Sequence, residues 1–319
     1  MKVLVTEPII DSELQRLDEQ TQLTVGQRGE FNCEDALIEA ASHYDALLTM
    51  LSNPVTRKVL RAGKNQLKIV ANYAVGTNNI DLEAARDFAI PVSNTPEVLT
   101  ESTAEIALSL ILSVARKTTE AESRLRDGEF RGWEPTGFLG LELHGARLGI
   151  VGLGRIGQAL AKRARACGME ILYHNRRRIE METEKQLNAH YVENLDQLLP
   201  AVDVLSLHCP LTEKTHHLID AERLKLLPDH ALIINTSRGP VIDEKALVDA
   251  LRQGSIGGAG LDVFENEPKV EPGLLETPNT VLLPHIGSAT YKSRRAMGRL
   301  AVNAILSVQK NQTPGNLVT

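Results

Sequence analysis

The chain has 319 residues, enough for two domains of typical size, and its 42% hydrophobic and 24% charged residues are ordinary values for a soluble globular protein. A formal net charge of −6 provides no positive field, so we expect neither nucleic acid nor a membrane surface as a partner. Cys33, Cys167 and Cys209 are widely spaced without a CxxC pair, and the amino terminus does not resemble a signal peptide. These features predict reduced thiols and a cytoplasmic protein.

Apolar segments of strand length alternate with amphipathic segments of helical length through the first part of the chain. The expected strands are Val3–Val5, Leu23–Val25, Ala46–Met50, Leu67–Ala71 and Pro91–Ser93. The expected helices lie near residues 12–20, 33–41, 56–62 and 81–88, with Ser12, Asn32 and Asp81 as candidate N-caps. This alternation predicts a parallel sheet with helices on both faces.

The pattern changes at residues 94–100, where a segment containing a proline leads into a long helix. Ser102 and Glu105 have the spacing of a capping box. The helix is apolar on almost all sides from Ala104 to Ala115, which predicts that it is buried at a domain or subunit interface.

Strand and helix patterns alternate again after a polar loop that contains Trp133. Strands are expected at 147–151, 169–174, 202–207, 231–235, 258–263 and 280–283, followed by a helix to about residue 310. Because a lone C-terminal helix has no neighbour of its own, we expect it to return to the first domain. The chain is therefore predicted to be α/β, with two doubly wound parallel sheets: one domain of residues 1–98 plus 288–319, and an inserted domain of residues 99–287.

The clearest motif is Gly152-Leu153-Gly154-Arg155-Ile156-Gly157, between an expected strand and an amphipathic helical segment. In this context the first glycine permits a tight turn, the second lets a pyrophosphate approach the backbone, and the third lets the helix pack on the strand. Free N–H groups at the start of the helix would bind phosphate oxygens. The motif predicts a Rossmann NAD(P)-binding domain, and a purely structural turn is the weaker alternative.

The segment after the next strand indicates which dinucleotide binds. NAD-selecting domains usually carry an acidic residue there, which holds the ribose 2′-hydroxyl. This chain instead has His174, Asn175 and then Arg176-Arg177-Arg178. Guanidinium groups pair with a 2′-phosphate, whereas a carboxylate repels it. We therefore expect NADP(H) to be preferred with NAD(H) possible, although a solvated basic turn would also account for the pattern.

Three further segments resemble a known family: Asn235–Pro240, Gly260–Pro268 and Pro284–Thr290. With the glycine motif and the segment Tyr73–Asp81, they are similar to the D-isomer-specific 2-hydroxyacid dehydrogenases over essentially the whole chain. The glyoxylate/hydroxypyruvate reductase branch is most similar, through the segments TESTAEIALSLILSVAR, GEFRGWEP and FLGLELHGARLGIVGLGRIG. The resemblance implies a flavodoxin-like substrate domain, an inserted dinucleotide-binding domain and a homodimer.

The same resemblance makes Arg238, Glu267 and His285 the catalytic residues, and their chemistry agrees with these roles. Reduction of a 2-keto acid needs a hydride, a cation for the carboxylate and a proton for the developing alkoxide. Arg238 can bind the carboxylate and polarise the carbonyl. His285 can donate the proton, and Glu267 would orient it and favour its protonated form. Protonated His285 would serve reduction, and neutral His285 would serve oxidation.

Further positions match the family's cofactor and substrate sites. The resemblance assigns Leu51, Ser52, Val75 and Gly76 to the substrate, together with Arg238 and His285. In the family, backbone N–H groups at the positions of Val75 and Gly76 hold the substrate carboxylate. Besides the glycine motif and residues 175–178, the cofactor positions are Thr103, His208, Cys209, Pro210, Thr215, Thr236, Ser237, Asp262 and Gly287.

The motifs leave alternatives open. They predict a reductase that converts glyoxylate and hydroxypyruvate into glycolate and D-glycerate, but a D-lactate or broad-specificity 2-hydroxyacid dehydrogenase also fits. A formate dehydrogenase is disfavoured because those relatives carry glutamine where this chain has Glu267. From a different class, a dinucleotide-sensing corepressor uses the same fold. Trp133 could reach a substrate pocket or anchor an interface. The adjacent His216 and His217 would point apart on a helix or strand, so no metal site is expected.

Overall fold

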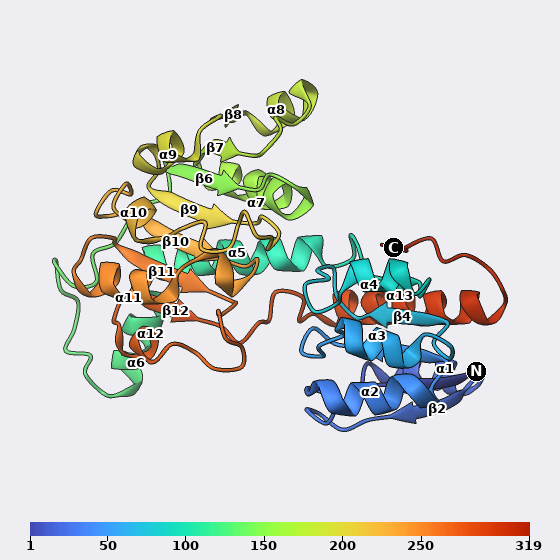
Figure 1. Cartoon of the computed structure of the whole chain (residues 1–319). Coiled ribbons are helices and arrows are strands. Elements are labelled where there is room, and N and C mark those ends of the chain that lie inside the picture. The colour runs from blue at the N-terminus through green and yellow to red at the C-terminus, as the bar shows by residue number, and fades with distance from the viewer. The chain divides into compact units, whose positions relative to one another are not determined.

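Short apolar segments form two separate parallel sheets in the computed structural model, which describes all 319 residues. The chain divides into two units, Met1–Leu99 with Ser288–Thr319, and Thr100–Gly287. They are called here the five-stranded unit and the seven-stranded unit, after their sheets (Figure 1). None of the helices is long and apolar enough to cross a membrane.

The sheet of the five-stranded unit has the strand order β2-β1-β3-β4-β5, with every pair parallel. Its strands are β1 (Lys2–Val5), β2 (Gln22–Val25), β3 (Ala46–Thr49), β4 (Ile69–Asn72) and β5 (Val92–Ser93). Its helices are α1 (Asp11–Asp18), α2 (Glu34–His43), α3 (Arg57–Gly63), α4 (Leu82–Asp87) and α13 (Tyr291–Gln309). The central strands β3 and β4 are buried along their whole length, as parallel strands covered on both faces should be.

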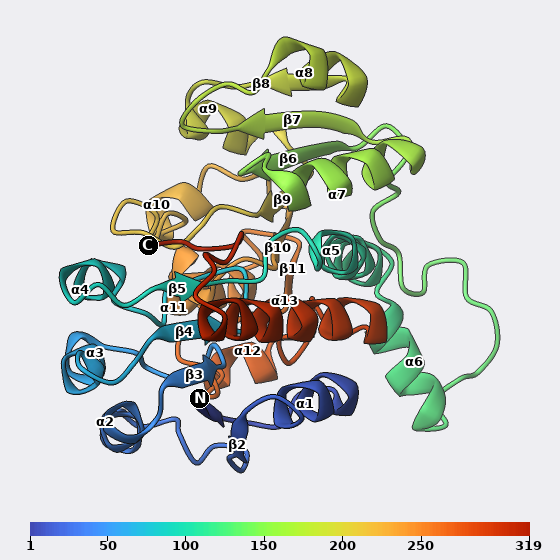
Figure 2. The ribbon, with the colours of Figure 1, turned by 90° about the vertical axis from the view of Figure 1, so that its right-hand side faces the viewer.

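Helices cover both faces of this sheet. Figure 2 shows α2, α3 and α4 on one face and α1 and α13 on the other. From α13, Met297, Val302 and Ile305 are buried in the core that includes Val5 of β1 and Ile69 of β4. The expectation that the C-terminal helix packs on the first part of the chain is therefore confirmed.

The seven-stranded sheet has the order β12-β11-β10-β9-β6-β7-β8, again all parallel. Its strands are β6 (Arg147–Val151), β7 (Glu170–His174), β8 (Ala189–Tyr191), β9 (Val204–Leu207), β10 (Leu232–Asn235), β11 (Gly258–Leu261) and β12 (Thr280–Leu282). The chain runs outward from β6 to β8 and then crosses to β9 on the other side. This reversal between β6 and β9 is the switch point at which open α/β sheets bind their ligands.

Two layers of helices cover the seven-stranded sheet. The helices are α5 (Thr100–Ala115), α6 (Thr118–Arg126), α7 (Arg155–Ala166), α8 (Met181–Leu187), α9 (Leu195–Leu198), α10 (Ala221–Leu224), α11 (Glu244–Arg252) and α12 (Pro272–Glu276), with short 3-10 turns η1 (Leu199–Ala201) and η2 (Gly239–Val241). One core contains apolar residues of α5, α7 and α8, and a second core contains those of α9 to α12.

The apolar helix α5 is buried mainly inside its own unit. It packs against β10, β11 and α7, and Ala107, Leu110 and Ile111 are fully buried there. This packing explains why the helix is apolar on several sides without requiring a domain or subunit interface. Leu112 is 40% exposed and Trp133, in the loop that follows α6, is 86% exposed.

Several local expectations are wrong at the ends of helices. Of the three candidate N-caps only Asp81 caps a helix, accepting a hydrogen bond from the N–H of Ala84 at 2.8 Å. Ser12 lies inside α1, and the residue before α2 is Cys33 instead of Asn32. α5 begins at Thr100, so Ser102 does not occupy its cap position. Polar residues near the start of a helix locate its first residue only to within one or two positions.

Candidate active site

The glycine motif forms the turn between β6 and α7. Gly152 has a φ of 98°, and a Cβ there would lie 2.7 Å from the backbone nitrogen of Cys209, so the turn requires glycine. A Cβ at Gly157 would lie 2.6 Å from the carbonyl oxygen of Gly152. Gly154, in contrast, has open space where its Cβ would be. The turn therefore leaves room for a pyrophosphate beside the first N–H groups of α7, and these residues fit a dinucleotide.

Residues after β7 form the rim where the ribose would lie. The side-chain oxygen of Asn175 accepts a hydrogen bond from the N–H of Leu153 at 2.7 Å, which ties this rim to the glycine turn. Arg176 and Arg177 follow with exposed side chains. The strand end thus presents an amide and two cations where NAD-selecting domains usually present a carboxylate.

Arg178 differs from the two arginines before it. Its guanidinium donates to both carboxylate oxygens of Glu184, with Nε–Oε1 at 2.8 Å and Nη2–Oε2 at 2.7 Å. The buried hydroxyl of Tyr173 also donates to Glu184. The hydrogen bonds from Arg178 and Tyr173 lower the pKa of Glu184 to about 2, so it remains ionised. The sequence suggested three equivalent arginines, whereas the structure neutralises one of them with a carboxylate.

Predicted cofactor residues also follow β9 and β10, the strands beside β6. His208 lies next to Ser206 and Thr236, with Nε2 2.9 Å from the Ser206 hydroxyl and Nδ1 3.5 Å from the Thr236 hydroxyl. Burial lowers the pKa of His208 to about 4, so its ring is neutral near neutral pH. The Ser237 hydroxyl donates to the side chain of Asn235 at 2.8 Å.

Thr215 and Pro210 belong to the loop that leaves β9. The Thr215 hydroxyl donates to the carbonyl oxygen of Pro210 at 2.7 Å and accepts from the N–H of Thr212 at 2.8 Å. Cys209 is buried beside the glycine turn, and burial raises the pKa of its thiol to about 11. Thr215 and Pro210 shape the loop through contacts within it, and the buried Cys209 is held as a neutral thiol near neutral pH.

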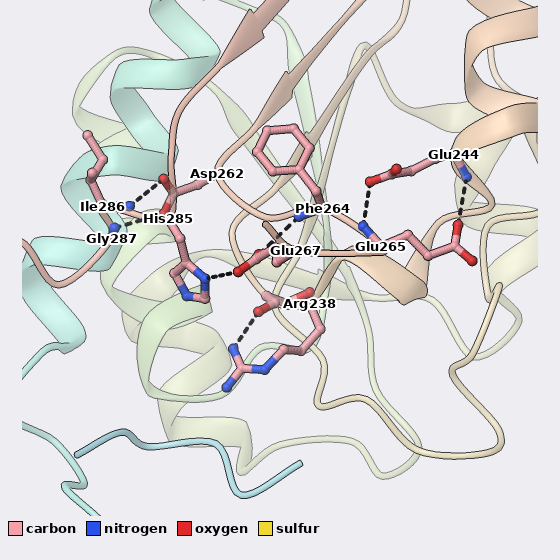
Figure 3. Close-up of polar contacts among 10 residues, drawn as sticks. Arg238, Glu244, Asp262, Phe264, Glu265, Glu267, His285, Ile286 and Gly287 are labelled. Atoms are coloured by element: carbon pink, nitrogen blue, oxygen red, sulfur yellow. Dashed lines mark hydrogen bonds and ion pairs between the residues drawn. The ribbon is translucent and has the colours of Figure 1, made fainter. Parts of the chain in front are cut away.

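The three residues assigned to catalysis come from the ends of three neighbouring strands. Arg238 follows β10, Glu267 follows β11 and His285 follows β12. His285 Nδ1 lies 2.9 Å from Glu267 Oε2. The other oxygen of Glu267 accepts a hydrogen bond from the N–H of Phe264 at 3.1 Å. Figure 3 shows the Glu267 carboxylate between the imidazole and Arg238, whose Nη1 donates to the carbonyl oxygen of Ser237 at 2.6 Å.

Burial and charge act in opposite directions at this cluster. Burial alone would raise the pKa of Glu267, but the hydrogen bond and charge of His285, the Phe264 N–H and the charge of Arg238 bring it below its usual value. Burial lowers the pKa of Arg238, and the charge of Glu267 opposes that shift. Glu267 is therefore ionised over the working pH range and is available to orient an imidazolium.

Asp262 fixes the segment that carries His285. Its two carboxylate oxygens accept hydrogen bonds from the N–H groups of Ile286 and Gly287, both at 2.7 Å (Figure 3). Thr103 donates to the carbonyl oxygen of Gly287 at 3.3 Å, so two predicted cofactor residues also hold this turn. His285 itself has a φ of 54°, in the left-handed region that is strained for a non-glycine residue. These contacts hold the backbone that follows His285, and Glu267 holds its imidazole.

The predicted substrate residues Leu51, Ser52, Val75 and Gly76 lie in the other unit, after β3 and β4. β3 and β4 are adjacent, so the two loops meet at one edge of the five-stranded sheet. The side chain of Asn79 joins the loops by donating to the carbonyl oxygen of Met50 at 3.0 Å. Val75 is 37% exposed and Gly76 is partly exposed, so the loop after β4 reaches the surface of its unit.

The expectation that the adjacent histidines point apart is wrong. His217 has a φ of 48°, and this left-handed residue brings its ring to 4.1 Å from that of His216, centroid to centroid. Ligand atoms of both histidines and of Glu265 lie within 4.8 Å of one another. His217 Nε2 is 2.9 Å from Glu265 Oε1, which is a hydrogen-bonded pair. The expectation failed because nothing in the sequence indicates that the backbone of His217 is left-handed.

Sequence reasoning also missed Glu184, Glu244 and Glu265. Glu184 lies beyond the basic segment that it neutralises, and Glu244 and Glu265 are joined across 21 residues. No local spacing connects these partners, so only the fold reveals them.

The chain matches the family model described as the D-isomer specific 2-hydroxyacid dehydrogenase, NAD binding domain, over residues 108–287. It is 44% identical to a glyoxylate reductase of Thermococcus litoralis, covering 99% of this chain and 96% of the relative. A solved structure of an NADPH-dependent glyoxylate/hydroxypyruvate reductase from Sinorhizobium meliloti, in complex with NADP and malonate, has a TM-score of 0.88 and 36% identity, covering 100% of this chain and 96% of that one.

A glyoxylate reductase from Paecilomyes thermophila is similar as well, with a TM-score of 0.89 and 35% identity over 100% of this chain and 98% of that one. These similarities extend over both units and include the strand ends that carry the site. The chain belongs to the family of D-isomer specific 2-hydroxyacid dehydrogenases and is an oxidoreductase of this family.

Proposed function

We propose that this protein reduces glyoxylate and hydroxypyruvate to glycolate and D-glycerate, with NADPH preferred over NADH. The observation that carries the proposal is the pairing of His285 with Glu267 beside Arg238, at the ends of adjacent strands. The names of similar proteins support the choice of substrates. The seven-stranded unit would hold the dinucleotide and the five-stranded unit would serve as the substrate domain.

Each of the three side chains has a distinct task in this reaction. Arg238 binds the substrate carboxylate and polarises the neighbouring carbonyl group. His285 uses Nδ1 for Glu267, which leaves Nε2 to give its proton to the developing alkoxide. Glu267 keeps the imidazole oriented and favours its protonated form.

The bound dinucleotide supplies the hydride that forms the new C–H bond at the keto carbon. The electron pair of the carbonyl double bond moves to oxygen, which takes the proton from His285. The imidazole is then neutral and recovers a proton from solvent. In the oxidative direction, neutral His285 accepts the hydroxyl proton instead, so reduction is favoured at lower pH.

NADPH preference should depend on Arg176 and Arg177. Both are exposed after β7, whereas Arg178 is paired with Glu184. Replacing Arg176 and Arg177 together by alanine is expected to raise KM for NADPH about 10- to 100-fold, because two charge-assisted phosphate contacts are lost. KM for NADH should change by less than about threefold, since NADH lacks the phosphate. Initial rates with each cofactor provide the measurement.

Arg178→Ala is the matched control for this double variant. It should affect KM for NADPH less than the loss of Arg176 and Arg177, because its guanidinium is already neutralised by Glu184. Equal loss of affinity for NADPH and NADH in the double variant would show that these arginines bind something other than the 2′-phosphate.

The pH dependence of glyoxylate reduction should change when Glu267 is replaced. The pKa of Glu267 lies below its usual value, so the carboxylate stays charged throughout the assay range and its stabilising effect is lost only in acid. In Glu267→Gln, kcat/KM for glyoxylate should fall about 10- to 100-fold near neutral pH because the imidazole loses the group that orients it, and the loss of rate that protonation of Glu267 causes in acid should be absent. The measurement is kcat/KM for glyoxylate as a function of pH. Glu276→Gln, at an exposed glutamate, should retain the wild-type profile.

A panel of initial rates tests the proposed function itself. Glyoxylate, hydroxypyruvate and pyruvate would each be assayed with NADPH and NADH. We expect glyoxylate and hydroxypyruvate to be reduced with a higher kcat/KM than pyruvate, and NADPH to be the better donor. Turnover restricted to pyruvate and NADH would contradict both specificities. Dinucleotide binding without turnover of any of the three would favour a sensor over an enzyme.

A further inference from the structure

The start of α11 and the segment after β11 are joined by two reciprocal hydrogen bonds. The N–H of Glu265 donates to Glu244 Oε1 at 2.6 Å, and the N–H of Glu244 lies 3.5 Å from Glu265 Oε2 (Figure 3). Glu244 is only 4% exposed, although it is the first residue of a helix. A buried carboxyl group that bonds a distant N–H group fixes one chain segment against another.

Two further contacts fix the same segment. A Cβ at Gly239 would lie 1.9 Å from the carbonyl carbon of Phe264, so the residue after Arg238 packs directly on the backbone before Glu265. His217 Nε2 holds the carboxylate of Glu265 at 2.9 Å. The segment is therefore held by the arginine-bearing turn, by α11 and by the loop after β9.

This segment leads directly to Glu267. Glu267 accepts a hydrogen bond from the N–H of Phe264 with one oxygen and bonds His285 with the other. The orientation of the Glu267 carboxylate therefore depends on where the backbone of Phe264 and Glu265 lies. Glu244 holds that backbone from the side opposite to the imidazole (Figure 3).

We propose that Glu244 is a positioning residue for the reaction proposed above: by bonding the N–H of Glu265 it holds the segment from Phe264 to Glu267, so that Glu267 keeps His285 in its working orientation. The proposal rests on the proposed function, because it assigns Glu244 a part in the same proton transfer. Glu244 touches neither of the reacting groups and acts through Glu265 and Glu267.

The length of the Glu244 side chain should matter more than its charge. Burial raises the pKa of Glu244 to about 7; the N–H of Glu265 opposes the shift, and the charges of Glu265, Glu271 and Glu267 add to it. Three other titratable groups lie beside the pair: His216 and His217, whose ring nitrogens are within 4.8 Å of the Glu265 carboxylate, and Asp243, whose Oδ2 is 4.0 Å from His217 Nδ1. A neutral side chain that still places an oxygen at the N–H of Glu265 should therefore serve.

Two variants separate length from charge. Glu244→Gln keeps the oxygen and should retain kcat for glyoxylate reduction within about threefold, since a neutral amide oxygen accepts the same bond. Glu244→Asp keeps the carboxyl group but is one methylene shorter, so it cannot reach Glu265, and kcat should fall about 10- to 100-fold. If Glu244 acted only by placing a negative charge at the N-terminus of α11, Glu244→Asp should have a higher kcat than Glu244→Gln. Aspartate keeps this charge in the first turn of the helix, and glutamine does not.

A pH profile distinguishes positioning from a loss of folding. In Glu244→Asp, loosened pairing of Glu267 with His285 should make reduction fall off at lower pH than in the wild type, which a smaller folded fraction would not do. Asp249→Asn, at an exposed carboxylate of the same helix, should leave both kcat and the profile unchanged. Should Glu244→Asp not fold, Glu244→Met, which has a similar size but offers no oxygen to the N–H of Glu265, should produce the same shift in the profile.

The outcomes separate this proposal from the proposed function. A wild type that reduces none of the keto acids would overturn the proposed function. If the wild type reduces the keto acids and Glu244→Asp has the same kcat and the same pH profile, the positioning role of Glu244 is overturned and the proposed function stands. An active Glu244→Asp combined with an inactive Glu244→Gln would show that the charge of Glu244 matters, which also contradicts the proposal.

Discussion

Replacement of His285 by glutamine is expected to lower kcat for glyoxylate reduction by about 10²- to 10⁴-fold, the usual contribution of a positioned general acid. Glu267 Oε2 holds the imidazole through Nδ1 at 2.9 Å. Glutamine can occupy the same space but cannot deliver a proton to the alkoxide. The measurement is kcat at saturating glyoxylate and dinucleotide, together with the dissociation constant of the dinucleotide, which should change little.

The matched control for this prediction is His43→Gln. His43 is exposed at the end of α2 in the five-stranded unit, so its loss should leave kcat unchanged. A second readout is the pH profile: the proposed proton donation predicts that the wild-type rate declines as pH rises, and the His285→Gln variant should lose this decline. Retention of both kcat and this decline in His285→Gln would show that another group supplies the proton.

Replacement of Arg238 by alanine should lower kcat/KM for glyoxylate by about 10²- to 10³-fold, the range seen when one donor to a developing oxyanion is removed. The half-buried guanidinium lies beside the Glu267 carboxylate and is fixed by the Ser237 carbonyl oxygen, so it is already oriented before substrate arrives. Its loss removes both the carboxylate contact and the polarisation of the carbonyl group.

Arg238→Lys tests whether the planar guanidinium is required. Lysine keeps the charge but cannot pair with a carboxylate through two parallel N–H groups, so it should recover only part of the lost kcat/KM. Added guanidinium ion should partly restore the alanine variant and have no effect on the wild type. Full activity of Arg238→Lys would show that charge alone is needed, and full activity of Arg238→Ala would remove Arg238 from the mechanism.

Much of the site could be predicted because parallel strands align their carboxyl ends. The glycine motif, Arg238, Glu267 and His285 each follow a strand of the same sheet, so residues far apart in sequence meet at one edge. The patterns that predict strands are local in sequence. A residue just after a predicted strand can therefore be assigned to the carboxyl edge of the parallel sheet. The cap by Asp81 was predictable for the same reason, since its partner is three residues away.

The contacts that refine the site could not be predicted in this way. Arg178 was grouped with its neighbours because charge is visible in sequence, whereas its pairing with Glu184 depends on how α8 packs beside β7. The hydrogen bond between Glu244 and Glu265 joins the start of α11 to the segment after β11, which are distant in sequence. The left-handed backbone of His217 and of His285 reorients both rings without any glycine to signal it.

The assigned reaction is tested most directly by the chirality and amount of glycerate that the wild-type protein forms from hydroxypyruvate and NADPH. We expect D-glycerate, the isomer that the D-isomer specificity of the family indicates, in an amount equal to the NADPH consumed, because each turnover adds one hydride to the keto carbon and one proton to its oxygen. Formation of L-glycerate, or oxidation of NADPH without glycerate, would contradict the assigned reaction even though the fold and the family remain as described.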